Sequence, residues 1–313
     1  MNQSKRMTDG ALLTAVFIVI LLASMFIPIL SVAAILFLPI PFIMFTSRYD
    51  WKPALLMLVA AILSSILVAT FISIPLAVPA AIGGIMIGGA IHKNLSAYET
   101  WARGTFGFII GLLFAFVFTQ VVLQVNILNE FKQITDESFK MSVSLMDQFT
   151  TEEQTEAFQK SMEQAVTLLT NLFPFFLVCA AVSQALISQW LGYKLINRLE
   201  RKKLRFPPFR TLRFPVSILF IYLFALLSSY MITDPDSMLF MAAQNFIFII
   251  QMLLTIQGFS FLFFYAHHKK MTKAFPIICI VIALFMPPLL FIVRFIGIID
   301  LGLNLRDRLE KKR

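Results

Sequence analysis

Two charged side chains in the last apolar stretch, Arg294 and Asp300, offer the clearest chemistry in this 313-residue sequence. A charge in the hydrocarbon layer of a membrane costs at least about 2.5 kcal/mol unless it meets a partner or water. Because the two residues are six positions apart, they are not same-face neighbours on one helix. We therefore expect Asp300 to pair with a basic group near the end of the stretch, such as Arg306.

Amide side chains inside two other apolar stretches are candidates for binding a ligand. Gln184 lies in one stretch, and the other contains Gln244, Asn245, Gln251 and Gln257. Gln244 and Gln251 are seven positions apart, so they lie on one stripe of a helix. Such amides either hydrogen-bond between helices, at roughly 0.6 kcal/mol each, or face a substrate cavity. The sequence leaves both interpretations open.

Small residues four positions apart form strips on three predicted helices. These strips are Gly84 with Gly88, Gly107 with Gly111, and Ala11 with Ala15. Strips of this kind let helix backbones approach closely. Packing inside the protein explains them most simply, and a docking face for another membrane protein is the alternative.

The sequence lacks the Walker A loop, the G-x-S-x-G elbow and the H-E-x-x-H zinc motif. We therefore expect no enzymatic activity, no cofactor and no metal. Cys179 and Cys279 both lie in apolar runs, which favours packing over a disulfide framework. The net charge of +9 is carried by short loops beside apolar runs, which indicates contact with anionic lipid headgroups rather than nucleic acid.

Long uncharged blocks define the elements that must position these residues. No charged side chain occurs between Asp9 and Arg48, or between Lys52 and Lys93. As one helix, residues 10–47 would measure roughly 57 Å, about twice the thickness of a bilayer core. Each block therefore predicts two crossings, and the fold class is an all-α polytopic transmembrane bundle.

The same reasoning along the chain predicts eight to ten membrane-embedded helices. Full spans are expected at 10–28, 53–72, 80–91, 101–125, 168–193, 214–233 and 238–265. A shorter element at 31–46 should be bent or unwound by Pro39 and Pro41. Residues 274–298 form either a hairpin turning at Pro287–Pro288 or a single helix, and the basic C-terminal tail favours the hairpin.

Charge predicts the orientation. Lys5 and Arg6 precede the first helix, and residues 194–213 contain eight Lys or Arg, so both segments should be cytoplasmic. Acid-rich residues 130–163 predict an amphipathic helical insertion on the outer side. We expect a single integral membrane domain, 1–313, with a six-span half at 1–193, a basic loop at 194–213 and further spans at 214–313.

Nearly the whole chain resembles the YybS family, which comprises uncharacterised multi-pass membrane proteins of Bacillus and relatives. The resemblance rests on four motifs: Ala11-Leu12-Leu13-Thr14-Ala15; Leu38-Pro39-Ile40-Pro41 followed by Arg48; Asn245 with Gln257-Gly258; and Gly297-Ile298-Ile299-Asp300 with Arg306. It implies a place in the bacterial plasma membrane and no settled biochemical role.

The first six spans also resemble, more distantly, the S components of energy-coupling-factor vitamin transporters and MreD-like cell-shape proteins. In S components a small-residue strip on the first helix docks the coupling subunit, and the resemblance places this strip at Ala11 and Ala15. The spans after Lys194 depart from a plain S component.

Two hypotheses about function follow. The first is a non-enzymatic module that binds a small solute or acts in transport together with a membrane protein partner. The second is an interaction scaffold for cell-envelope or division machinery, which would use the basic segment 194–213.

Overall fold

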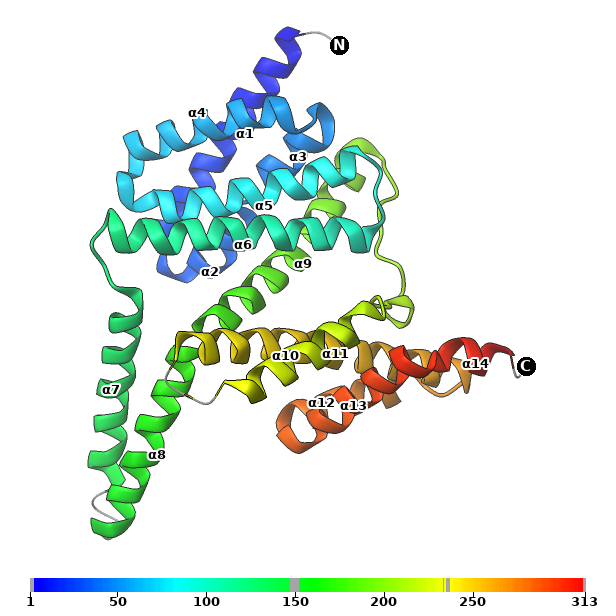
Figure 1. The fold of residues 1–313 in the computed structure, drawn as a ribbon. Helices are drawn as coiled ribbons and strands as arrows, with labels where there is room; N and C mark the ends of the chain where they lie inside the picture. Colours follow the sequence, from blue (N-terminus) through cyan, green and yellow to red (C-terminus); the bar gives the residue numbers. More distant parts are fainter. Residues whose placement is uncertain (1–2, 147–151, 233, 235–236, 312–313) are drawn as a thin grey trace. The chain divides into compact units, whose positions relative to one another are not determined.

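The computed structural model describes residues 3–146, 152–232, 234 and 237–311, and the regular elements there are helices (Figure 1). Within these ranges, seven helical stretches are long and apolar enough to cross a membrane, one of which, Pro28–Tyr49, consists of two short helices. Two shorter apolar helices accompany them. The predicted all-α polytopic class is confirmed. The chain divides into two compact units, Met1–Arg205 and Phe206–Arg313, and the boundary falls inside the basic segment.

The first unit contains nine α-helices and one short 3-10 helix within its described residues. They are α1 Gln3–Phe26, α2 Pro28–Phe37, α3 Ile40–Tyr49, α4 Trp51–Ala69, η1 Phe71–Ser73, α5 Ile74–His92, α6 Ala97–Val121, α7 Ile127–Met146, α8 Glu152–Asn171 and α9 Phe173–Glu200. Helix α5 packs against both α3 and α6 and forms the centre of the unit. Most of its apolar and small residues are buried.

The predicted break in the second element is present. Helix α2 ends at Phe37 and α3 begins at Ile40, with Leu38 and Pro39 between them. Pro39 lacks the N–H needed to continue the hydrogen-bond ladder of α2. The break lets α3 bury nearly all of its residues against neighbouring helices.

The predicted amphipathic insertion forms two helices, α7 and α8, which pack against each other. Both are more strongly amphipathic than the apolar spans, and Val143 and Val166 are buried. The insertion is longer than the predicted 130–163, because the helices run from Ile127 to Met146 and from Glu152 to Asn171. The side of the membrane that it occupies stays a prediction.

The basic segment 194–213 was expected to be a loop, but its first part is helical. Helix α9 continues to Glu200, since Ile196 is fully buried and anchors the last turns. The helix stops at Arg201, which adopts a left-handed conformation. The side chain of Asn197 then holds the non-helical segment that follows by two hydrogen bonds with the backbone of Leu204, at 2.7 and 2.8 Å.

The second unit contains η2 Phe209–Thr211, α10 Ser217–Met231, α11 Met238–His268, α12 Ala274–Phe285, α13 Pro287–Leu303 and α14 Leu305–Lys311. Its apolar core lies between α10, α11 and α13 and is formed by Ala225, Ile247, Ile250, Leu254 and Leu301.

The directions of these helices decide between the two predictions for the last apolar stretch. Helix α10 runs antiparallel to α11, because Phe214 contacts Gln257 while Tyr222 contacts Gln251.

Helix α10 also runs antiparallel to α13, because Gly302 faces Leu219 while Arg294 lies against Tyr222. Helices α11 and α13 therefore run in the same direction, and α12 must return the chain between them. The chain leaves the helical conformation at Met286, next to the expected turn at Pro287–Pro288. The hairpin is confirmed, and the C-terminal end of α13 lies at the same end of the unit as residues 209–214.

Candidate functional site

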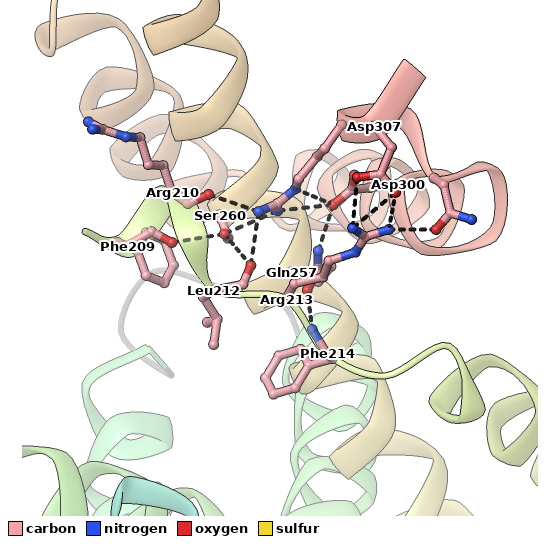
Figure 2. A network of polar contacts seen from close by, with 11 residues as sticks. Phe209, Arg210, Leu212, Arg213, Phe214, Gln257, Ser260, Asp300 and Asp307 are labelled. Carbon is pink, nitrogen blue, oxygen red and sulfur yellow. Dashed lines mark hydrogen bonds and ion pairs between the residues drawn. The ribbon is translucent and has the colours of Figure 1, made fainter. Parts of the chain in front are cut away.

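A buried polar network ties the second unit together at the end where α13 finishes (Figure 2). At its centre lie Asp300, which is 0% exposed, and Arg306, which is 6% exposed. Asp300 Oδ2 accepts hydrogen bonds from Arg306 Nε at 3.0 Å and from Gln257 Nε2 at 2.6 Å. Arg306 Nη2 also lies 3.0 Å from the same oxygen. The structure thus brings together the two residues for which the sequence suggested an ion pair.

Arg306 uses its whole guanidinium group in this network. Nη1 donates to the backbone carbonyls of Arg210 and Leu212 at 2.8 and 3.0 Å. Nη2 donates to Ser260 Oγ at 3.2 Å. Together with the bonds to Asp300, these contacts use all three guanidinium nitrogen atoms. Among the side chains, only arginine offers such a planar fork of donors. Burial lowers the pKa of Arg306 below its ordinary value, and the neighbouring Asp300 opposes that shift.

Helix α11 supplies the second half of the network. Ser260 donates to the carbonyls of Phe209 and Leu212 at 2.9 and 2.8 Å. Gln257 accepts a hydrogen bond from the backbone N–H of Phe214 at 3.0 Å. The side chains of α11, α13 and α14 therefore fix the backbone of residues 209–214, and we call this network the segment clamp.

The clamp leaves one acceptor unused. Asp300 Oδ1 is buried and has no hydrogen-bond partner in the structure. A second ion pair lies outside the clamp, where Arg213 Nη1 is 3.1 Å from Asp307 Oδ1, and both of its side chains are substantially exposed. The arrangement is that of a buried polar network that stabilises the fold. Among the described residues, no three metal-ligating side chains converge.

The amides predicted as ligand candidates mostly bond within the protein. Gln184 donates to the Ile35 carbonyl at 3.2 Å. Asn245 donates to Met241 of its own helix at 2.8 Å, and Gln251 donates to the Tyr222 hydroxyl at 3.2 Å. Gln257 belongs to the clamp, and Gln244 is half-buried on α11. Gln184 belongs to the first unit, and the other four amides belong to the second.

The glycine strips lie at close helix contacts. A Cβ atom on Gly84 would lie 2.6 Å from the Pro39 carbonyl oxygen, and one on Gly88 would lie 2.7 Å from that of Ile43. Equivalent atoms on Gly107 and Gly111, in α6, would collide with Met86 and Pro79 of α5. Both strips therefore serve internal packing among α3, α5 and α6.

The alanine strip differs, because Ala11 and Ala15 are exposed. They line a groove of about 890 Å³ between α1 and α4. Thr14 and Ile18 of α1 lie on one side, and the other side is formed by α4 residues that include Leu56, Met57 and Ala60. Gln3 and Arg6 lie at one end of the groove. We call this feature the α1–α4 groove.

A charged cluster in the first unit was not predicted as a site. Arg48 joins two helices, since its Nη1 lies 3.3 Å from Asp9 of α1 and its Nε lies 2.6 Å from Glu200 of α9. The Tyr49 hydroxyl donates to Asp9 at 2.8 Å. An open cleft of about 600 Å³ adjoins the cluster. Arg48 is one of three charged residues between the two apolar blocks, with Asp50 and Lys52. Sequence alone gives no signal that pairs it with residues 39 and 152 positions away.

Comparisons with known proteins agree with the assignment of the chain as a membrane protein, and they do not establish a function. A family model described as a predicted membrane protein (DUF2232) matches residues 15–301. The uncharacterized protein YybS of Bacillus subtilis (strain 168) is 27% identical over 310 residues, which cover 99% of this chain and 100% of that protein. No solved structure matches the chain.

Proposed function

Because the chain belongs to the DUF2232 family of predicted membrane proteins, we propose that it is a non-enzymatic membrane module that docks another membrane protein along the α1–α4 groove. The partner that fits is a transmembrane helix with an apolar face, as in a transport complex. The chain would lie in the bacterial plasma membrane with its N-terminus in the cytoplasm, where Lys5 and Arg6 favour it.

One observation carries this proposal, namely that the alanine strip is exposed while both glycine strips are covered. Small residues in membrane helices favour association because they let backbones approach closely. Helix α1 can still offer such a surface to a partner, whereas α5 and α6 use theirs on each other. The position agrees with the docking strip that the resemblance to S components implies.

Solute binding is not favoured by the described side chains. Four of the five amide candidates already make hydrogen bonds within the protein. A solute that displaced them would have to replace those bonds, because a buried polar group without a partner is costly.

The test is association of the full chain with its membrane partners after Ala11 and Ala15 are replaced by leucine. The two leucines should fill the groove and prevent co-purification of the partner from gently solubilised bacterial membranes. Ala180→Leu is the matched control, because Ala180 is also an exposed alanine on a membrane helix, α9, and lies outside the groove. Unchanged co-purification of the double variant would contradict the proposal.

A second candidate, the interaction scaffold, is supported by the exposed basic side chains Arg201, Lys203 and Arg205. Replacing all three with glutamine should release a partner that binds this segment. Lys269→Gln with Lys270→Gln removes exposed charge from the end of α11 and serves as the control. Retention of every partner by the triple variant would remove the scaffold interpretation.

A further inference from the structure

Arg294 is half-buried in the second unit, and the described residues of that unit form no ion pair with it. It belongs to α13, where the structure places it against the Tyr222 hydroxyl of α10. Its Nε atom is buried and has no hydrogen-bond partner among the described residues. The ion pairs of the described residues join Arg48, Lys202, Arg213 and Arg306 to acids and do not include Arg294. Tyrosine supplies a hydroxyl but not the negative charge that would balance the guanidinium.

The helix directions give the depth of Arg294. Helix α12 has 12 residues and rises about 18 Å from Lys273 to the turn, which is too short to cross a bilayer core of about 30 Å. From Met286 back to Arg294 the chain descends about 12 Å, so Arg294 lies roughly 6 Å from the level of Lys273. Tyr222, opposite it, lies about 8 Å into α10 from Ser217. If Lys273 and Ser217 lie at the membrane surface, both estimates put Arg294 in the hydrocarbon layer close to its headgroup edge, on the side of the segment clamp.

An arginine at this depth reaches the headgroup level with its side chain. Its neighbours on α13, Phe291 and Phe295, are 64% and 55% exposed. Phe220 and Phe224 on α10 are likewise strongly exposed. An apolar surface with one cation near its edge matches a phospholipid, whose acyl chains contact the aromatic side chains while its phosphate meets the guanidinium.

We propose that Arg294, assisted by the Tyr222 hydroxyl, binds the phosphate of a phospholipid from the leaflet on the clamp side. This site is independent of the α1–α4 groove, so either proposal can fail alone. The bound phosphate supplies the counter-charge that the described residues of the second unit do not give Arg294, and it fixes the re-entrant hairpin of α12 and α13 at its depth.

The experiment uses the full chain in maltoside micelles, which contain no phosphate. Phosphatidylglycerol is added to one sample and a phosphate-free glycosyl diacylglycerol to another, and lipid binding is followed by native mass spectrometry and by the melting temperature. Phosphatidylglycerol should bind and raise the melting temperature, while the glycolipid should not. Arg294→Gln should weaken phosphatidylglycerol binding by about tenfold or more, since a hydrogen-bonded charge pair is lost. The affinity of Arg294→Lys for phosphatidylglycerol should lie between those of the wild type and of Arg294→Gln.

Controls separate the sources of phosphate and of charge. Arg308→Gln removes an exposed charge from α14 and should leave the lipid effect unchanged. Inorganic phosphate alone should not stabilise the wild type, because it lacks acyl chains, and stabilisation by it would overturn the lipid assignment. Equal lipid binding by Arg294→Gln and the wild type would overturn the site. Failure of Arg294→Gln to fold in the phosphate-free micelle would also overturn the site. The charge of Arg294 would then be needed by a partner within the chain rather than by a lipid.

Discussion

Asp300 and Arg306 are joined side chain to side chain although they are six positions apart, because α13 ends between them. Asn304 adopts a left-handed conformation, with φ 49° and ψ 50°, and turns the chain into α14. On an uninterrupted helix the two residues would not share a face. Asparagine tolerates this conformation better than most residues, so it allows the ion pair to form.

Replacing Asp300 should destabilise the second unit strongly. Asp300→Asn removes the charge opposite Arg306 and leaves a buried guanidinium unbalanced, which typically costs 3–5 kcal/mol. Thermal unfolding in micelles is the measurement, and Asp307→Asn is the control, because its pair with Arg213 is exposed and should contribute about 1 kcal/mol or less. Equal melting temperatures for Asp300→Asn and the wild type would show that the clamp does not stabilise the fold.

Lysine should not replace Arg306. Its ammonium group keeps the charge, but a single nitrogen cannot reach Asp300, Ser260 and the carbonyls of Arg210 and Leu212 together. Arg306→Lys should expose residues 209–214, which limited proteolysis after the basic residues of this segment would detect. Arg308→Lys, on the exposed face of α14, should leave the cleavage rate unchanged. A protease-resistant segment in Arg306→Lys would mean that charge alone holds it.

The contact between α11 and α13 should not tolerate a methyl group. A Cβ atom at Gly297 would collide with the Leu254 carbonyl, and one at Gly258 with the Val293 carbonyl. Gly297→Ala should therefore cost about 1–3 kcal/mol by overpacking. At Gly302 the nearest atom would be 3.5 Å away, which is an ordinary contact, so Gly302→Ala should be nearly neutral. Similar unfolding temperatures for the two variants would contradict the helix packing described above.

Loss of Arg48 should lower the stability of the first unit where the Arg48 side chain links α1 to α9. Arg48→Gln leaves Asp9 and Glu200 without their shared cation, and the side chains involved are only partly exposed. We expect a loss of about 1–2 kcal/mol, less than for the fully buried Asp300 pair, because solvent screens these groups. Lys52→Gln, an exposed neighbour in sequence, is the control. A melting temperature equal to that of the control would show that this cluster contributes nothing.

Much of the fold was predictable from the sequence because membrane spans are a matter of length and polarity. The uncharged blocks around Arg48 predicted α1 to α5, and Pro39 predicted the break between α2 and α3. The C-terminal hairpin followed from the charge of the tail. Local patterns could not predict that α9 continues to Glu200, since its last turns depend on the tertiary burial of Ile196.

The candidate sites were less predictable. The pairing of Asp300 with Arg306 followed from the energy of a buried charge, but the carbonyl ligands of Arg306 depend on tertiary structure. The strips at Gly84 and Ala11 look alike in sequence, and only packing shows that one is covered and the other exposed. The contact of Arg48 with Glu200 joins residues 152 positions apart, which no local pattern reveals.

The most direct test of the docking proposal is site-specific photocrosslinking in intact membranes, with a photoreactive residue at position 11 of the full chain. The proposal predicts a crosslink to one membrane protein that disappears when Ala15→Leu is added, and no such crosslink from position 180 on α9. Absence of a crosslink at position 11, or the same product from positions 11 and 180, would contradict docking at the α1–α4 groove.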